Sequence, residues 1–316
     1  MKLWKILFIL CFTSLLFAEN QKKIIYLTPD LSIPFWQIIS KGVEESAKKL
    51  NYDFSVYSAG NSAKQELINT MKAIKSKPSA IVISPTNSSN CVTVLNLINK
   101  AEIPVVIADV GTDSGEYLSY ISSDNYHGAY KLGHALTSFM KKMKIENSSV
   151  GIIAIPQKRS NGKLRTTGFM KALNEVGIKS ADMRQQIDFS FDETYKYTKD
   201  LISLNPNMKV LWLQGSDKYG GALKAIEESK KEIYLITFDA EPEFLELIPK
   251  NIIVAAGMQQ PFLMGEKAVQ ILDSHLKGKK VDSHIELPIL AVTKENIERK
   301  LPLIKRNVLG IINETK

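Results

Sequence analysis

Short apolar runs alternate with longer amphipathic runs along most of the chain. The short runs, such as Ala80–Ser84 and Val150–Ile155, are apolar at consecutive positions, which predicts strands covered by helices on both faces. The longer runs carry apolar residues on one face only, as Ile39 and Val43 do in the predicted helix Phe35–Leu50. This alternation predicts an α/β fold with parallel sheets.

The strand–helix units form two series of similar length, which meet near residues 122–125. The predicted strands of the first series are Ile24–Thr28, Asp53–Ser58, Ala80–Ser84, Val105–Asp109 and Leu118–Ser122. Those of the second are Val150–Ile155, Met183–Ile187, Lys209–Gln214, Tyr234–Phe238 and Ile252–Gly257. The repetition predicts two doubly wound lobes with right-handed crossovers. Residues 122–125 are not a Gly/Pro/Ser-rich linker, so we expect short hinges between the lobes.

The first residues predict export. Lys2 and Lys5 precede the apolar run Ile6–Phe17, and the small residue Ala18 follows it. This layout is typical of a cleavable secretory signal peptide, here residues 1–18. An uncleaved anchor and a lipid attachment at Cys11 stay open as alternatives. We therefore predict a periplasmic protein.

Composition and motifs argue against several classes of protein. The 316 residues carry a formal net charge of +8, but the lysines are scattered along predicted helices, which argues against nucleic-acid binding. Examples are Lys41, Lys48, Lys49, Lys72 and Lys75. Removal of residues 1–18 leaves Cys91 as the single cysteine, so no intramolecular disulfide is expected. The four histidines lack the spacing of a metal site. No nucleotide-binding loop, dinucleotide fingerprint or nucleophile elbow is present, and we predict neither a cofactor nor an enzymatic activity.

Polar and aromatic residues follow several predicted strands at their carboxyl ends, where open α/β sheets hold small ligands. The candidates are Phe35, Trp36, Asp109, Lys163, Arg165, Phe189, Asp239 and Gln259. Aromatic rings stack on apolar ring faces, and carboxylates and amides accept hydrogen bonds from hydroxyl groups. The set favours a sugar or another small cyclic polar molecule as ligand.

Other interpretations of the same residues remain open from the sequence. Phe35 and Trp36 could belong to the core or to a helix entry, and Asp109 and Asp239 could cap the following helices. The two carboxylates could also be the catalytic pair of a hydrolase, which requires a separation of about 5–9.5 Å.

Seven short motifs, in their order and spacing, resemble one family. They occupy residues 33–36, 103–106, 122–125, 167–169, 238–239, 259–261 and 264–265. The mature chain resembles, over nearly its whole length, the periplasmic sugar-binding proteins of the ribose-binding type, which have the type I periplasmic binding fold. The resemblance implies two Rossmann-like lobes joined by a three-strand hinge, with crossovers near Asp124-Asn125, Gln259-Gln260 and Leu287-Pro288. The N-terminal lobe would contain residues 22–124 and 260–288, and the C-terminal lobe residues 125–259 and 289–316.

The resemblance also implies roles for the candidate residues. Phe35, Trp36 and Phe189 would sandwich the ligand ring, and Asp109, Asp239 and Gln259 would hydrogen-bond its substituents. The protein would be a monomer that closes on a sugar-like ligand and delivers it to an ABC transporter permease. The alternatives are a periplasmic ligand sensor for a histidine kinase or chemoreceptor, and a periplasmic carbohydrate-active enzyme.

The chain departs from the family pattern at positions that matter for sugar binding. The family often has Asn in place of Ile33, Arg in place of Val110, Arg near Lys163 and Asn near Gly215. Valine cannot replace the forked donors of a guanidinium. These departures argue against simple ribose and favour a less hydroxylated or differently charged ligand, with Lys163, Arg165 or Asp217 filling the gap.

Overall fold

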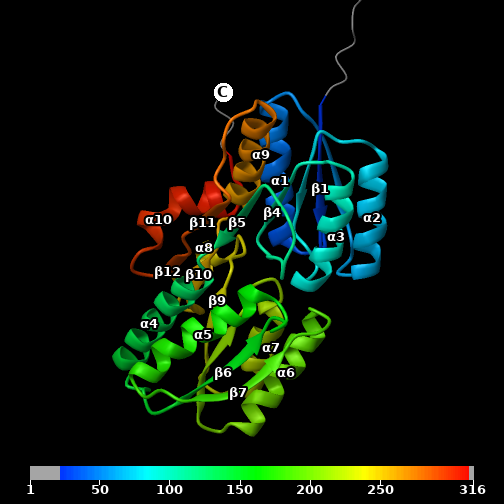
Figure 1. The fold of residues 1–316 in the computed structure, drawn as a ribbon. Helices are drawn as coiled ribbons and strands as arrows, with labels where there is room; N and C mark the ends of the chain where they lie inside the picture. Colours follow the sequence, from blue (N-terminus) through cyan, green and yellow to red (C-terminus); the bar gives the residue numbers. More distant parts are fainter. Residues whose placement is uncertain (1–21, 313–316) are drawn as a thin grey trace, which may run out of the picture.

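The computed structural model describes residues 22–312, which form two α/β lobes arranged end to end (Figure 1). Each lobe contains one six-stranded sheet with helices on both faces, so the predicted two-lobe α/β architecture is confirmed. The predicted signal peptide, residues 1–18, lies outside the described residues, and so does Cys11. Among the described residues, no helix combines the length and the apolar character needed to cross a membrane.

The N-terminal sheet is parallel throughout. In spatial order its strands are β11 (His284–Leu287), β5 (Ser119–Ser123), β4 (Val105–Ala108), β3 (Ala80–Ile83), β1 (Lys23–Thr28) and β2 (Asp53–Ser58). Its helices are α1 (Pro34–Lys49) and α9 (Pro261–Leu276) on one face, and α2 (Ala63–Lys75) and α3 (Ser88–Lys100) on the other. Ile24 and Tyr26 face the first helix pair, whereas Ile25 and Leu27 face the second. Burial on both faces explains the unbroken apolar run.

The C-terminal sheet is built in the same way. In spatial order its strands are β12 (Leu290–Thr293), β10 (Ile253–Met258), β9 (Tyr234–Phe238), β8 (Met208–Leu213), β6 (Ser149–Ala154) and β7 (Ser180–Gln185). One face packs against α4 (Asn125–Met143) and α5 (Ser160–Glu175). The other packs against α6 (Phe191–Leu204), α7 (Tyr219–Ser229), α8 (Phe244–Leu247), α10 (Ile297–Leu303) and the π-helix η1 (Ile304–Val308).

The edge strand β12 differs from the expected parallel arrangement, because it runs antiparallel to β10. Only residues 288 and 289 separate β12 from β11 of the other lobe. The chain therefore enters β12 at the end of the C-terminal sheet that faces the N-terminal lobe. From there the strand runs away from the N-terminal lobe. A connection this short leaves no room for the helical crossover that a parallel strand needs.

Three segments connect the lobes, and hydrogen bonds tie them together. The backbone N–H of Asp124 donates to the carbonyl of Leu287 at 2.9 Å. The amide of Gln260 donates to the carbonyl of Pro288 at 2.8 Å, and Asn307 donates to Gln260 Oε1 at 2.8 Å. Each crossover therefore contacts another.

We propose for the chain the lobe boundaries predicted from the sequence. In support, the strands on either side of these boundaries belong to different sheets. The C-terminal tail touches both lobes. Leu309 belongs to the core of the C-terminal lobe, and the carbonyl of Gly310 accepts a hydrogen bond from Lys41 Nζ of α1 at 2.8 Å.

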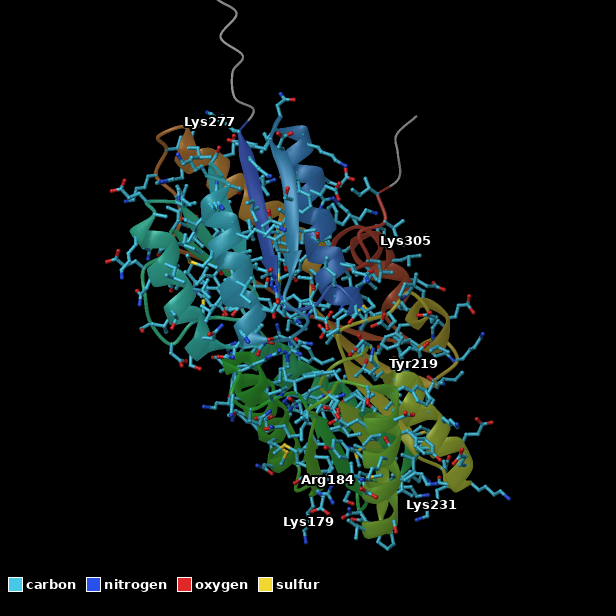
Figure 2. The ribbon with its side chains drawn as sticks, turned by 90° about the vertical axis from the view of Figure 1, so that its right-hand side faces the viewer. Lys179, Arg184, Tyr219, Lys231, Lys277 and Lys305 are labelled. Atoms are coloured by element: carbon cyan, nitrogen blue, oxygen red, sulfur yellow. The ribbon has the colours of Figure 1, made fainter. Side chains whose placement is uncertain are left out.

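Basic side chains lie at both ends of the molecule. Figure 2 shows Lys277 on the N-terminal lobe, Lys305 on η1, and Lys179, Arg184 and Lys231 toward the far end of the C-terminal lobe. Basic side chains therefore occur on both lobes.

The crossing of α1 and α9 requires a glycine. A Cβ atom at Gly42 would lie 2.2 Å from the carbonyl oxygen of Phe262, whereas a Cβ at the helical Gly220 would meet only a ring carbon of Phe191 at 3.6 Å. We predict that Gly42→Ala lowers the free energy of unfolding by about 1–3 kcal/mol, because the helices must move apart. Gly220→Ala should raise it by up to about 1 kcal/mol through helix propensity. Denaturant unfolding of both variants checks this, and equal effects would contradict the close packing.

Candidate ligand-binding cleft

A cavity lies between the lobes, at the carboxyl ends of the strands of both sheets. The N-terminal lobe contributes Ile33, Phe35, Trp36 and Asp109. The remaining lining residues are Ile155, Arg159, Asn161, Arg165, Phe189, Gly215, Ser216, Asp217, Asp239, Glu241 and Gln259. All of the candidate residues predicted from the sequence line this cavity except Lys163.

Asp109 and Asp239 occupy equivalent positions in the two lobes. Asp109 directly follows β4 and Asp239 directly follows β9. Both have a left-handed backbone, with φ of 66° and 67°, and each N–H donates to a carbonyl of the adjacent strand at 2.9 Å. Aspartate tolerates this conformation better than most residues. Neither residue caps a helix, because α4 is capped by Asp124 and α8 has no side-chain cap. The capping interpretation is therefore wrong.

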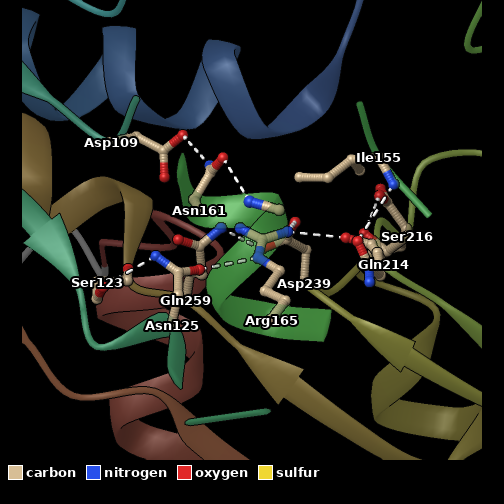
Figure 3. A network of polar contacts seen from close by, with 12 residues as sticks. Asp109, Ser123, Asn125, Ile155, Asn161, Arg165, Gln214, Ser216, Asp239 and Gln259 are labelled. Carbon is tan, nitrogen blue, oxygen red and sulfur yellow. Dashed lines mark hydrogen bonds and ion pairs between the residues drawn. The ribbon is translucent and has the colours of Figure 1, made fainter. Parts of the chain in front are cut away.

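Arg165 of α5 is the most heavily bonded side chain of the cavity. Its Nε donates to Asn125 Oδ1 and its Nη1 donates to the carbonyl of Gln214, both at 2.8 Å. Asp239 Oδ2 lies 3.5 Å from Nη1, and the guanidinium carbon lies 4.0 Å from the ring centre of Phe238. Figure 3 shows Arg165 with Asn125, Gln214 and Asp239 around it. Burial of the charge is compensated by this set of partners.

Three cavity residues, Asp109, Asp217 and Gln259, carry buried acceptors without a hydrogen-bond partner among the described residues, and of these only Asp217 Oδ2 has an ion-pair partner, Lys218 at 3.0 Å. Asn161 Nδ2 lies 3.4 Å from Asp109 Oδ2 and thereby bridges the lobes, but Asp109 Oδ1 accepts no hydrogen bond. Gln259 Nε2 donates to Asp239 Oδ1 at 2.6 Å, whereas Gln259 Oε1 accepts none. Asp109 and Gln259 are only 2% and 1% exposed. Such buried acceptors are costly unless a ligand or water donates to them.

The aromatic residues of the cavity come from both lobes. Trp36 is 4% exposed and packs in the core against α9, with the ring of Phe35 edge-on at 4.9 Å. Trp36 is therefore a core residue that also lines the cavity. Phe35 and Phe189 are half-buried, and they provide one aromatic face from each lobe.

Burial shifts the acid–base behaviour of the lining. It raises the pKa of Asp109 to about 6, against the lowering effect of Arg165 and with a smaller contribution from Asp239. It raises the pKa of Glu241 to about 7, with further increases from Asp217, Asp239 and Glu243. Burial also raises the pKa of Asp217 and of Asp239, and it lowers the pKa of Arg159. The cavity is therefore rich in carboxyl groups that resist ionisation.

Lys163 lies outside the cavity, on the exposed face of α5. The helix begins at Ser160, three residues before Lys163, and Arg159 before it provides no side-chain cap that the sequence could have signalled. Asn161 and Arg165 are four residues apart and share the cavity face, so Lys163 points to the opposite face. The prediction for Lys163 is corrected accordingly.

Four polar lining residues were missed by the sequence reasoning: Arg159, Asn161, Ser216 and Glu241. Glu241 follows Asp239 by two positions, and this second carboxylate at the same strand end was an available signal. Of the positions that depart from the family pattern, Ile33 and Gly215 do line the cavity. Val110 belongs instead to the core of the N-terminal lobe.

Residues 22–312 contain no cluster of His, Cys, Asp and Glu side chains that could hold a metal ion. Cys91 of α3 is a buried free thiol in the core of the N-terminal lobe, and burial raises its pKa to about 12. It lies outside the cavity lining.

Comparison with known families and proteins bears out the resemblance. The family described as periplasmic binding protein domain matches residues 24–280. The ribose import binding protein RbsB of Haemophilus influenzae is 25% identical over 281 residues, covering 88% of this chain and 93% of that protein. The D-apiose import binding protein of Paraburkholderia graminis is 24% identical over 269 residues, covering 84% of this chain and 85% of that protein.

Solved structures share the fold. A carbohydrate transporter solute-binding protein from Agrobacterium radiobacter, crystallised with D-arabinose, superposes with a TM-score of 0.82 at 23% identity, covering 92% of this chain and 100% of that one. The glucose-galactose binding protein GanP of Geobacillus stearothermophilus gives a TM-score of 0.78 at 23% identity, covering 88% and 99%. At this identity the superpositions establish the two-lobe fold.

The pKa of Glu241 predicts a pH-dependent stability. Folding raises this pKa from 4.5 to about 7, so between these values only the folded protein keeps the proton. The free energy of unfolding therefore falls as the pH rises through this window. Glu241→Gln cannot ionise and should be more stable than the wild type at pH 8 by on the order of 2–3 kcal/mol, with no difference near pH 4.5.

Ligand-free melting curves from pH 4.5 to pH 8 check this prediction. The exposed Glu243→Gln is the matched control and should not show the gain at pH 8. A stability difference for Glu241→Gln that does not change with pH would contradict the assignment.

Proposed function

Because this chain belongs to the periplasmic binding protein domain family, we propose that it is an exported receptor that closes its two lobes on a small sugar-like ligand. The family consists of binding proteins rather than enzymes, so the hydrolase hypothesis for Asp109 and Asp239 is abandoned. The relatives named as import binding proteins and the predicted signal peptide, residues 1–18, support a periplasmic location.

The observation that carries the proposal is the pair of buried acceptors in the cavity between the lobes. Asp109 Oδ1 belongs to the N-terminal lobe, and Gln259 Oε1 lies at a crossover between the lobes. A ligand with several hydroxyl groups can donate to both. A ligand held this way bridges the two lobes and stabilises the closed arrangement, since it binds that arrangement more strongly than an open one.

The aromatic residues complete the proposed recognition. Phe35 from one lobe and Phe189 from the other offer apolar faces to the C–H side of a sugar ring. Apolar faces with a few well-placed polar groups are typical of small-molecule sites.

The proposed destination of the ligand is an ABC transporter permease that receives it from the closed protein. A periplasmic sensor for a histidine kinase or chemoreceptor would use the same binding step, so the role of the cavity is common to both. We expect the protein to act as a monomer.

Asp109→Asn tests the cavity with little disturbance of the fold. Asparagine has nearly the same shape and tolerates the left-handed backbone. A thermal-shift screen of the wild type against aldoses and ketoses, including D-ribose, D-arabinose, D-allose and D-apiose, should identify a ligand that raises the melting temperature. For that ligand Asp109→Asn should lose about ten- to hundredfold in affinity, since a hydrogen bond to a charged acceptor is removed.

The ligand-free melting temperature of Asp109→Asn should equal or exceed that of the wild type at pH 8. Lys163→Ala, on the exposed face of the same cavity-lining helix α5, is the control and should bind like the wild type. Equal affinities of Asp109→Asn and the wild type would place the ligand elsewhere.

A further inference from the structure

The charges of the cavity do not balance. The lining contains the carboxyl groups of Asp109, Asp217, Asp239 and Glu241 but only two cationic groups, those of Arg159 and Arg165. An excess of carboxyl groups in a buried site favours a ligand that brings positive charge.

Three of the four carboxyl groups have a cation close by. Asp239 pairs with Arg165 at 3.5 Å, and Asp217 pairs with Lys218 at 3.0 Å. Asp109 lies in the field of Arg165 and Arg159, which both favour its ionised form.

Glu241 has no cationic neighbour among the described residues. Its Oε1 accepts a hydrogen bond from the hydroxyl of Ser216 at 2.9 Å. The charged groups that act on it are Asp217, Asp239 and Glu243, all of them acidic. The phenol of Tyr219 also lies within the field of Glu241. Glu241 is only 8% exposed, and its carboxyl group lines the cavity with no protein partner for its charge.

Two further observations indicate that a ligand with hydrogen-bond donors belongs here. Asp109 Oδ1 and Gln259 Oε1 are buried acceptors without partners, and both residues line the same cavity as Glu241. Acceptors of this kind call for O–H or N–H donors on the ligand.

We propose that the ligand is a hydroxylated amine such as an amino sugar, whose ammonium group pairs with Glu241 while its hydroxyl groups donate to Asp109 and Gln259. The inference rests on the proposed function, because it assigns chemistry to the ligand of that same cavity. The ammonium group supplies the counter-charge that Glu241 lacks, and a charge-assisted hydrogen bond in a site shielded from water is stronger than one between neutral groups.

A competing arrangement makes a different prediction about pH. A protonated Glu241 could donate a hydrogen bond to a neutral sugar, and that binding would weaken as the pH rises through 7. An ammonium ligand requires the ionised carboxylate, so its binding strengthens between pH 5.5 and pH 7. The direction of the pH dependence separates the two arrangements.

The test compares sugars that differ only by an amino group in place of a hydroxyl group. The pairs are D-glucosamine with D-glucose, D-galactosamine with D-galactose, and D-mannosamine with D-mannose, measured at pH 7 by thermal shift and calorimetry. At least one amino sugar should bind the wild type about tenfold or more tightly than its hydroxyl partner, as one good charge pair allows. Glu241→Gln should lose this preference, so that the amino sugar and its hydroxyl partner bind with similar affinity. The exposed Glu243→Gln removes the same charge outside the lining and should keep the preference.

The outcomes distinguish this inference from the proposed function. Neutral sugars that bind as tightly as their amino partners, or a preference that survives Glu241→Gln, would overturn the ammonium assignment and leave the sugar-receptor function in place. An affinity for the amino sugar that falls as the pH rises from 5.5 to 7 would overturn it as well. A complete lack of binding by sugars and amino sugars alike would overturn the proposed function itself.

Discussion

The buried guanidinium of Arg165 is the interaction on which the cleft depends. A charge removed from water is tolerated only where fixed partners compensate it, and this one is surrounded by Asn125, Gln214, Asp239 and the ring of Phe238. Asn125 begins α4 directly after the first crossover, and Asp239 accepts a hydrogen bond from Gln259 at another. One side chain thus fixes the positions of the hinge and of the cavity wall relative to each other.

The two lobes present carboxylates to the cleft in the same way. Asp109 and Asp239 each directly follow a strand and have a left-handed backbone. The N–H of each donates to a carbonyl of the neighbouring strand, and the carboxyl group thereby points into the space between the lobes. This geometry brings acidic groups into the lining of one buried cavity. Burial then raises their pKa values, and the cavity gains a strong preference for hydrogen-bond donors. The unpaired Glu241 extends that preference toward a positively charged donor.

The hinge and the site share residues. Gln259 lines the cavity, whereas its neighbour Gln260 bonds to Pro288 and Asn307 and is absent from the lining. A ligand that engages Gln259 therefore acts on a segment whose next residue ties the crossovers together. In the proposed closing of the lobes, binding and lobe movement would be coupled through adjacent residues of one strand end.

The sequence by itself determined the two-lobe α/β fold, because consecutive apolar positions and amphipathic runs follow directly from burial of sheets between helices. It also identified most of the lining, since parallel strands bring their carboxyl ends to one edge. Only the tertiary structure decided the antiparallel direction of β12, which follows from the connection of two residues between the lobes. It also decided that Lys163 lies outside the cavity, because α5 begins at Ser160 and turns this side chain to its exposed face. Contacts between distant segments give Arg165 its partners and leave Glu241 without a cationic neighbour. No local sequence pattern encodes which buried charges have a partner of opposite sign.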